Sequence, residues 1–259
     1  AVVLATGGFA NDIALRTSQD PRLTAEIGST NKFSTTGEAL REALRIGAMP
    51  VHLSWIQLGP WTCPDEKGYG IGPDFASYIA FPYGIMVNPK TGRRFVNELA
   101  DRKIRADAIL QVGRPCIGIA DEAGVGASEK PIAHCLNKGI VKKFDHLEEI
   151  AETFQIPMQA LQKTVETFNA GVEQGVDKEF GKPIVANAKP LRYPPYYGMR
   201  LWPKVHHTMG GVLINAQAQV LGLSHQPMAG FYAAGEVTGG IHGACRLGSC
   251  AIIDCLVFG

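Results

Sequence analysis

The chain has 259 residues, enough for one large domain or two modest domains with cores of their own. Apolar residues make up 46% and charged residues 19% of the sequence, and its glycines and prolines are spread along the chain, which excludes extensive disorder. The formal net charge of +1 gives no reason to expect nucleic acid or an anionic membrane as a partner, and no apolar run reaches the roughly 18 residues that span a bilayer.

The first residues predict a buried strand that runs into a glycine turn. Residues 1–4 are apolar and β-branched, and Thr6, Gly7 and Gly8 follow them. Glycines after a strand let backbone N–H groups approach a phosphate or a ring, although such turns are also common structural devices. Because natural chains rarely start inside a strand, we expect a further segment before this one.

The next part of the chain alternates between regular and irregular patterns. Apolar positions in residues 36–47 have the spacing of an amphipathic helix. Residues 61–83 are rich in Gly, Pro, Asp and aromatic residues and predict a long loop, a kind of segment that is often functional. Residues 84–88 and 94–97 predict a hairpin whose turn is Pro89 to Gly92.

The remainder of the chain predicts further strands and helices. We expect strands at 117–120, 211–214 and 231–234, helices at 146–154 and 158–172, a glycine-rich loop at 235–248 and a buried helix at 251–258. Both ends of the chain therefore have the strand-and-glycine character of nucleotide-binding proteins, and a mixed α and β insertion separates them.

The six cysteines do not indicate a metal centre. None belongs to a CxxC or CxxCH pattern, so zinc ribbons, thioredoxin chemistry and covalent haem attachment are unsupported. Cys245, Cys250 and Cys255 recur every five residues, and small buried side chains explain them better than metal ligands. The cellular compartment stays open.

Polar residues gather in three segments. His206 and His207 enter a glycine turn, where they can bind a carboxylate or a flavin or simply be paired loop histidines. Residues 94–102 form the hairpin's charged flank, which an exposed hairpin would also explain. In the loop 235–248, glycines permit close backbone approach, Glu236 can accept hydrogen bonds from ribose hydroxyls, and Arg246 can grip a carboxylate through two parallel N–H bonds.

Together these segments resemble one family. It is the fumarate reductase–succinate dehydrogenase flavoprotein family, in particular its soluble flavocytochrome c type and the urocanate reductase-like enoate reductases. The resemblance runs through nearly the whole chain and rests on ATGGF at 5–9, RRFVNELADR at 93–102, HHTMGG at 206–211 and AGEVTGGIHGACRLG at 234–248.

The resemblance implies a fold and a domain division. It implies an α/β FAD-binding domain, Rossmann-like and of the glutathione reductase type, with an inserted α+β capping domain. The FAD-binding domain would comprise residues 1–59 and 206–259, and the capping, substrate-clamping domain residues 60–205. The domain would be incomplete, because the family's first βαβ unit with its GxGxxG turn is absent from this sequence.

The resemblance also implies roles for single residues. Arg102 matches the family's proton donor, and Arg246 and His206 match the pair that binds the substrate carboxylate, so these three are the expected catalytic residues. The expected FAD contacts are Thr6, Gly7, Gly8, His207, Gly235, Glu236, Ala251 and Ile252. An arginine acid is unusual, because the pKa of a free arginine side chain lies above about 12, so its proton acceptor must be a strongly basic carbanion.

Several positions depart from the family pattern. Gly59 stands where fumarate reductases carry a histidine for the second carboxylate, and residues 75–83 hold no acid or arginine, only Ser77, Tyr78 and Tyr83. Cys245 replaces an asparagine before the carboxylate-binding arginine. We therefore expect a substrate other than fumarate. A monocarboxylate with an aromatic tail, urocanate-like or cinnamate-like, would suit Trp61, Tyr78 and Tyr83 if these line the pocket, but packing explains them equally well.

Three interpretations of the chain remain open. The first is an FAD-dependent reductase of a small unsaturated carboxylate, supplied with electrons by a haem or FMN domain or protein. The second is another flavoenzyme of the same fold, such as a ketosteroid dehydrogenase. The third is an incomplete or non-catalytic flavoprotein fragment that needs an N-terminal segment or a partner to bind FAD.

Overall fold

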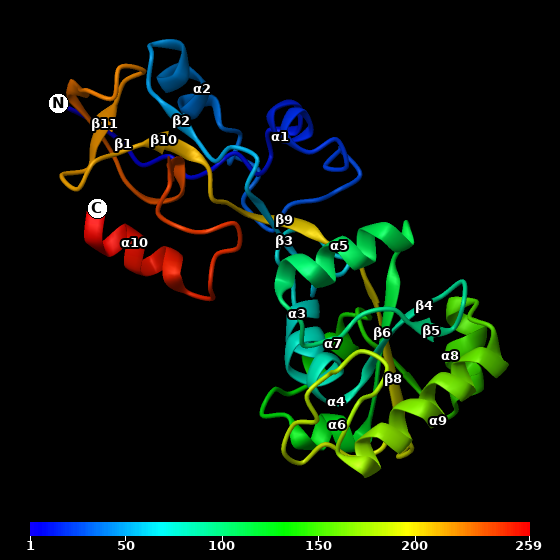
Figure 1. Ribbon diagram of the computed structural model, residues 1–259. Coiled ribbons are helices and arrows are strands. Elements are labelled where there is room, and N and C mark those ends of the chain that lie inside the picture. Colours follow the sequence, from blue (N-terminus) through cyan, green and yellow to red (C-terminus); the bar gives the residue numbers. More distant parts are fainter. The chain divides into compact units, whose positions relative to one another are not determined.

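The computed structural model describes residues 1–259, and the chain divides into two compact units. Unit 1 consists of residues 1–59 and 204–259, and unit 2 of residues 60–203 (Figure 1). The second boundary lies two residues before the predicted one at 205/206. The reason is that Lys204 and Val205 begin β9 (Lys204–Thr208), which pairs with β3 (Ile56–Gly59) inside unit 1. No helix is long and apolar enough to cross a membrane.

Unit 1 contains three small sheets. In the first, β1 (Val2–Leu4) runs parallel to β12 (Pro227–Ala233), which pairs antiparallel with β11 (Gln219–Leu221). The second has the order β13 (Thr238–Gly239), β10 (Gly211–Leu213), β2 (Pro50–Val51), and the third is the β3–β9 pair. The helices are α1 (Ile13–Gln19), α2 (Glu38–Arg45), α10 (Cys250–Phe258) and a 3₁₀ turn, η2 (Gly235–Val237). The predicted strands at 211–214 and 231–234 and the helix within 36–47 are confirmed. The strand at 1–4 also forms, but it is not buried as predicted, because Val2 and Val3 are exposed.

Buried polar contacts fix the first segment of unit 1. Asp12 caps α1 by accepting a hydrogen bond from the backbone N–H of Leu15 at 2.9 Å, and it is also ion-paired with Arg41. Arg16 is fully buried and donates to four backbone carbonyls, those of Ala10, Leu23, Thr24 and Ile27. The irregular segment after α1 is therefore tied down through its backbone.

Unit 2 is built around a five-stranded sheet of order β5-β4-β6-β8-β7. Its strands are all antiparallel to their neighbours: β4 (Ile85–Asn88), β5 (Arg93–Arg94), β6 (Cys116–Asp121), β7 (Lys142–Phe144) and β8 (Tyr196–Leu201). The helices are α3 (Gly72–Phe75), a π-helical turn (Ala76–Ala80), α4 (Phe81–Tyr83), α5 (Arg102–Val112), α6 (Glu122–Ala127), α7 (Ala133–Asn137), α8 (Leu147–Phe154) and α9 (Met158–Gln174).

The two-residue period of the strands gives this sheet two apolar faces. Ile85 and Ile119 point into a cluster formed with α8 and α9, whereas Met86 and Ala120 point into a second cluster formed with α3, α4 and α5. Because both faces are covered, the sheet forms the centre of unit 2. The strand predicted at 117–120 and the helices predicted at 146–154 and 158–172 are confirmed.

Four predictions of local structure were wrong. Residues 72–83 of the predicted loop form helical turns. The strand predicted at 94–97 is limited to Arg93–Arg94, because the backbone N–H of Met86 on β4 donates to the Glu98 side chain at 3.0 Å rather than to a paired strand. His206 and His207 lie on a strand rather than in a loop. Among the side chains of α10 only Asp254 is buried, so this helix and Cys255 are not buried as predicted.

Candidate active site

His206 and Arg246 lie together in unit 1. The Nε2 atom of His206 is 3.3 Å from Nη2 of Arg246, and the Nδ1 atom of His206 is 2.9 Å from the Thr30 hydroxyl. β9 supplies the histidine, and the glycine-rich loop supplies the arginine, which is buried. The structure thus brings two of the three predicted catalytic residues into contact across 40 residues of sequence.

Gln57 anchors the loop that carries Arg246. Its Nε2 atom donates to the Arg246 carbonyl at 2.8 Å and to the Cys245 sulfur at 3.0 Å. Gln57 is buried on β3, directly opposite His207 of β9. A backbone hydrogen bond from a rigid strand restricts the main chain of the arginine, so the loop is positioned by the β3–β9 pair.

The first glycine turn lies against the residues that follow the two histidines. Gly8 approaches so closely that a Cβ atom there would lie 2.0 Å from the Thr208 hydroxyl and 2.5 Å from the Glu236 carboxylate. The N–H of Phe9 donates to the Thr208 hydroxyl at 3.3 Å. Gly7 has a φ of 75°, which favours glycine. The glycine turn at residues 6–8 and the loop 235–248 therefore meet within unit 1.

His207 and Glu236 form the second polar pair of unit 1. The Nδ1 atom of His207 is 3.2 Å from the Glu236 carboxylate, which also accepts the N–H of Thr208 at 2.9 Å. Burial raises the pKa of Glu236, but the hydrogen bonds from His207 and Thr208 outweigh burial and leave that pKa below its ordinary value. Glu236 is therefore an anion that orients the His207 ring.

Several buried polar atoms beside this pair have no hydrogen-bond partner within the chain. They include the Nε2 atoms of His207 and His242 and the Oε1 atom of Gln57. The rings of His207 and His242 are 5.6 Å apart, and burial lowers the pKa of His242 despite Asp254 at 3.6 Å. Buried polar atoms in folded proteins normally have partners, so these atoms together with the close glycines fit a polar, ring-bearing ligand such as FAD.

The other predicted FAD contacts also belong to unit 1. Gly235 has a φ of 75° and opens η2, and a Cβ atom there would lie 3.2 Å from the sulfur of Cys255 on α10. Ala251 is half-buried, and Ile252 is 63% exposed. Thr6 is exposed after β1. No group of His, Cys, Asp and Glu side chains has a metal-binding arrangement.

Arg102 belongs to unit 2, where it is the first residue of α5. Its guanidinium carbon lies 4.8 Å from the centre of the Trp61 ring, a cation–π contact. Asp101 caps the helix by accepting a hydrogen bond from the N–H of Lys103 at 2.8 Å. The cap and the ring together fix the direction in which Arg102 leaves the helix.

A buried ion cluster supports the segment that leads to Arg102. Arg94 donates to Glu98 at 2.9 and 2.7 Å and to Asp177 at 3.0 and 2.8 Å, and its side chain is only 1% exposed. Lys182 donates to the Gly84 carbonyl at 2.5 Å and lies 3.7 Å from Glu98. Arg94 and Glu98 of RRFVNELADR thus form part of the core, whereas Arg93 and Asp101 are exposed, so an exposed hairpin explains this segment only in part.

The remaining predicted substrate residues have contacts inside their own units. Gly59 is buried at the end of β3 and pairs with Lys204. The Tyr83 hydroxyl donates to the Ala127 carbonyl at 3.2 Å, and the exposed Tyr78 ring lies 5.1 Å from the Lys130 ammonium. Tyr78 and the half-buried Ser77 belong to the π-helical turn, a rare geometry that is frequent at functional sites.

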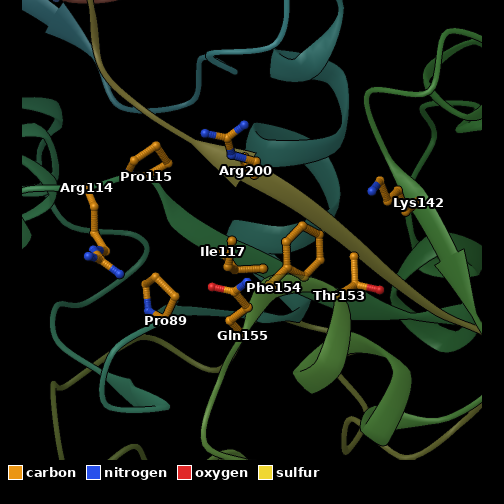
Figure 2. Close-up of a pocket in the computed structure, with 9 residues that line it drawn as sticks. All are labelled: Pro89, Arg114, Pro115, Ile117, Lys142, Thr153, Phe154, Gln155 and Arg200. Carbon is orange, nitrogen blue, oxygen red and sulfur yellow. The ribbon is translucent and has the colours of Figure 1, made fainter.

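A basic hollow of about 480 Å³ lies beside β6 and β8 in unit 2. Figure 2 shows the Phe154 ring and Gln155 near its centre, with Arg114 and Lys142 on opposite sides. The third cation, Arg200, is ion-paired with Asp65 at 2.7 Å. All three cations are exposed, and no predicted site residue lines the hollow. We therefore keep it separate from the candidate site.

Sequence reasoning missed Thr30 and the anchoring role of Gln57. Thr30 stands 176 residues from His206, and no local pattern marks it. Gln57 could have been found from the position of Ile56-Gln57 within a short apolar strand, because a buried polar side chain there needs a partner.

Comparison with known proteins yields a family and several relatives. The family described as FAD binding domain matches residues 1–252. The acrylate reductase flavoprotein subunit of Shewanella woodyi is 44% identical over 264 residues, which cover all of this chain and 52% of that protein. The chain therefore spans about half the length of this relative.

Two solved structures are similar over the whole fold. One is the open conformation of a flavocytochrome c3 fumarate reductase, with a TM-score of 0.81 and 34% identity, covering 100% of this chain and 44% of that one. The other is 3-ketosteroid delta1-dehydrogenase from Sterolibacterium denitrificans, with a TM-score of 0.76 and 26% identity, covering 99% of this chain and 51% of that one.

Proposed function

Since this chain belongs to the FAD binding domain family, among the fumarate reductase and succinate dehydrogenase flavoproteins, we propose that it forms part of an FAD-dependent enoate reductase. The reaction adds a hydride and a proton across the activated C=C bond of a small unsaturated carboxylate. One C–H bond forms at the β-carbon and one at the α-carbon, and the C=C bond becomes single.

The contact between His206 and Arg246 is the observation that carries this proposal. An arginine held through both its backbone and its side chain is suited to bind a carboxylate through two parallel N–H bonds. A carboxylate held in this way accepts more negative charge, so the carbanion that develops at the neighbouring carbon is stabilised.

The FAD site of the proposal is the polar cluster of unit 1. His207, Glu236 and Gly235 on one side and Thr6, Gly7 and Gly8 on the other would hold the cofactor, with Ala251 and Ile252 on α10. When bound in its reduced form, FAD supplies the hydride. The anionic Glu236 fixes the His207 ring, whose Nε2 atom is buried and can pair with a polar group of the cofactor.

Arg102 is the proposed proton donor. The Trp61 ring and the capped start of α5 hold its guanidinium group, which would protonate the α-carbon of the substrate. Because an arginine gives up its proton only to a strong base, the step depends on the carbanion that hydride addition creates. Arg102 is therefore expected to control kcat more than substrate affinity.

The proposed substrate is a monocarboxylate with a small tail. Gly59 offers no side chain for a second carboxylate. Arg102 covers the Trp61 ring, and the Tyr83 hydroxyl is bonded to Ala127, so two of the three candidate aromatics have packing roles inside unit 2. The relative named acrylate reductase flavoprotein subunit agrees with a small enoate. Electrons would reach the flavin from a haem or FMN domain or protein.

A stopped-flow panel tests the proposal with the FAD-loaded protein reduced by dithionite. Acrylate, cinnamate, urocanate, fumarate and a 3-ketosteroid whose ring already has the C=C bond conjugated with its carbonyl group are offered as oxidants, and flavin absorbance is followed. We expect rapid reoxidation by acrylate and little by fumarate. Arg246→Lys should lower kcat/KM for acrylate about 100-fold, because lysine cannot form the two parallel bonds.

Arg114→Lys provides the matched control, because Arg114 is an exposed arginine in the basic hollow (Figure 2). It should leave kcat/KM unchanged. Reoxidation by the steroid alone would favour the ketosteroid dehydrogenase interpretation. Failure of the chain to bind FAD would favour the fragment interpretation.

A further inference from the structure

Thr30 lies beside β9, outside every segment that the sequence marks for chemistry. Its backbone N–H donates to the Val205 carbonyl at 2.9 Å, and the Val205 N–H donates to the Gly28 carbonyl at 2.9 Å. Ser29 also pairs with Val205 as an isolated parallel bridge. Residues 28–30 therefore run parallel to β9 as a short additional strand, which places the Thr30 hydroxyl next to His206.

The segment that leads to Thr30 is held by a buried cation. Arg16 is 2% exposed and donates to the carbonyls of Leu23 at 3.0 Å and Thr24 at 2.6 Å, and also to that of Ile27. These bonds fix the backbone just before Gly28. The position of the Thr30 hydroxyl is thus set by main-chain contacts on both sides.

Two hydrogen bonds through His206 connect Thr30 with Arg246, and a third joins the Thr30 hydroxyl to the Val205 carbonyl. The Thr30 hydroxyl is 2.9 Å from Nδ1 of His206 and 3.4 Å from the Val205 carbonyl, and Nε2 of His206 is 3.3 Å from Nη2 of Arg246. A guanidinium group can only donate, so Nε2 of His206 must accept. A neutral imidazole with a lone pair on Nε2 carries its proton on Nδ1, which then donates to the Thr30 oxygen.

Only this tautomer gives each donor between Arg246 and Val205 an acceptor. The Thr30 hydroxyl accepts from Nδ1 and passes its own hydrogen to the Val205 carbonyl. In the opposite tautomer, or in the imidazolium form, an N–H on Nε2 would face an N–H of Arg246 at 3.3 Å. Two donors at that distance repel each other, so the arginine would turn away.

We propose that Thr30 is a positioning residue that holds His206 in the Nδ1–H tautomer, so that Nε2 orients the Arg246 guanidinium group. The resting histidine is a neutral acceptor, and Arg246 carries the positive charge that meets the substrate carboxylate. The catalytic consequence rests on the proposed function, whereas the tautomer does not.

Nitrogen NMR of the protein with ¹⁵N-labelled histidine tests the tautomer directly. His206→Gln identifies the signals of this residue. The wild-type protein and Thr30→Ser should show a protonated Nδ1 and an unprotonated Nε2. Thr30→Val, which keeps the shape of the side chain but loses the hydroxyl, should shift the signals toward the Nε2–H form. A protonated Nε2 in the wild type, or signals that Thr30→Val leaves unchanged, would overturn the inference.

Steady-state kinetics of the FAD-loaded protein with acrylate test the consequence. Thr30→Val should raise KM about tenfold and change kcat less than about threefold, since one orienting hydrogen bond is lost before chemistry begins. Thr30→Ser should restore the wild-type KM. Thr24→Val is the matched control, because the exposed Thr24 lies in the same segment and contacts neither His206 nor Arg246 through its hydroxyl.

The two measurements separate this inference from the proposed function. If no enoate reoxidises the reduced wild-type protein, the proposed function fails, while the NMR result still decides the tautomer. If acrylate is reduced but Thr30→Val leaves KM unchanged, the positioning role fails and the proposed function stands.

Discussion

Two polar clusters of this chain, one in each unit, differ in how their buried groups are paired. In unit 2, Arg94, Glu98, Asp177 and Lys182 satisfy one another between the sheet and α9. In unit 1, His207, His242 and Gln57 keep buried atoms without a partner in the chain, and the apolar side chains of α10 are exposed. The ion cluster of unit 2 therefore satisfies itself within the chain, and the histidine cluster of unit 1 resembles a surface shaped to receive other groups.

The largest expected effect concerns the buried ion cluster of unit 2. Arg94→Ala removes the cation that both buried carboxylates, Glu98 and Asp177, share and should lower the free energy of unfolding by about 3–5 kcal/mol. Urea denaturation followed by tryptophan fluorescence measures this change. Arg93→Ala is the control on the same two-residue strand. Because Arg93 is exposed, a comparable loss in that variant would contradict the role of the cluster.

Lys182 gives the same cluster a pH dependence. Burial lowers the pKa of Lys182 from its ordinary value to about 8, although Glu98 raises it. Between about pH 8 and 10.5 the unfolded chain binds this proton and the folded chain does not, so the free energy of unfolding should rise with pH by up to about 3 kcal/mol. Lys182→Met should abolish the rise, measured by denaturation at each pH, whereas the exposed Lys178→Met should retain it.

A smaller effect is expected for the histidine cluster of unit 1. Glu236→Gln removes the anion that orients His207 and should weaken FAD binding about tenfold. Fluorescence titration of FAD into the apoprotein measures the Kd. The stability of unit 2 should not change. Equal FAD affinities for Glu236→Gln and the exposed Glu26→Gln would remove Glu236 from the proposed site.

The smallest effect concerns an exposed ion pair of unit 2. Lys103 and Asp107 are one helical turn apart on α5 and are joined at 2.5 Å, but water screens both side chains. Asp107→Asn should lower the free energy of unfolding by less than about 0.5 kcal/mol. A loss as large as that of Arg94→Ala would show that burial is not what distinguishes the two clusters.

The sequence predicts those parts of the fold in which one local pattern dominates. The β-branched run at 1–4 and the apolar stripe of α9 are examples. Residues 72–83 were misread because Gly72-Pro73 and Phe81-Pro82 resemble loop composition, although proline is well tolerated in the first turn of a helix.

The residues of the candidate site also differ in whether the sequence alone could identify them. The composition of the loop 235–248 was sufficient to single out Arg246 and Glu236. Thr30 could not be found, because its role depends on a contact with His206 that only the folded chain creates. For Arg94 an exposed hairpin remained a possible explanation, because sequence alone does not show that Asp177 meets it in the core.

Two neighbouring histidines on β9 point to opposite sides of one strand, as successive residues of a strand must. His206 meets Thr30 and Arg246, and His207 meets Glu236, so a single peptide bond separates the proposed anion-anchoring group from the group beside the proposed flavin site. Inserting or deleting one residue in this strand would exchange the two directions and undo both sets of contacts. Substrate preference in such a scaffold can therefore diversify by substitution around β9, while the length of the strand itself is fixed.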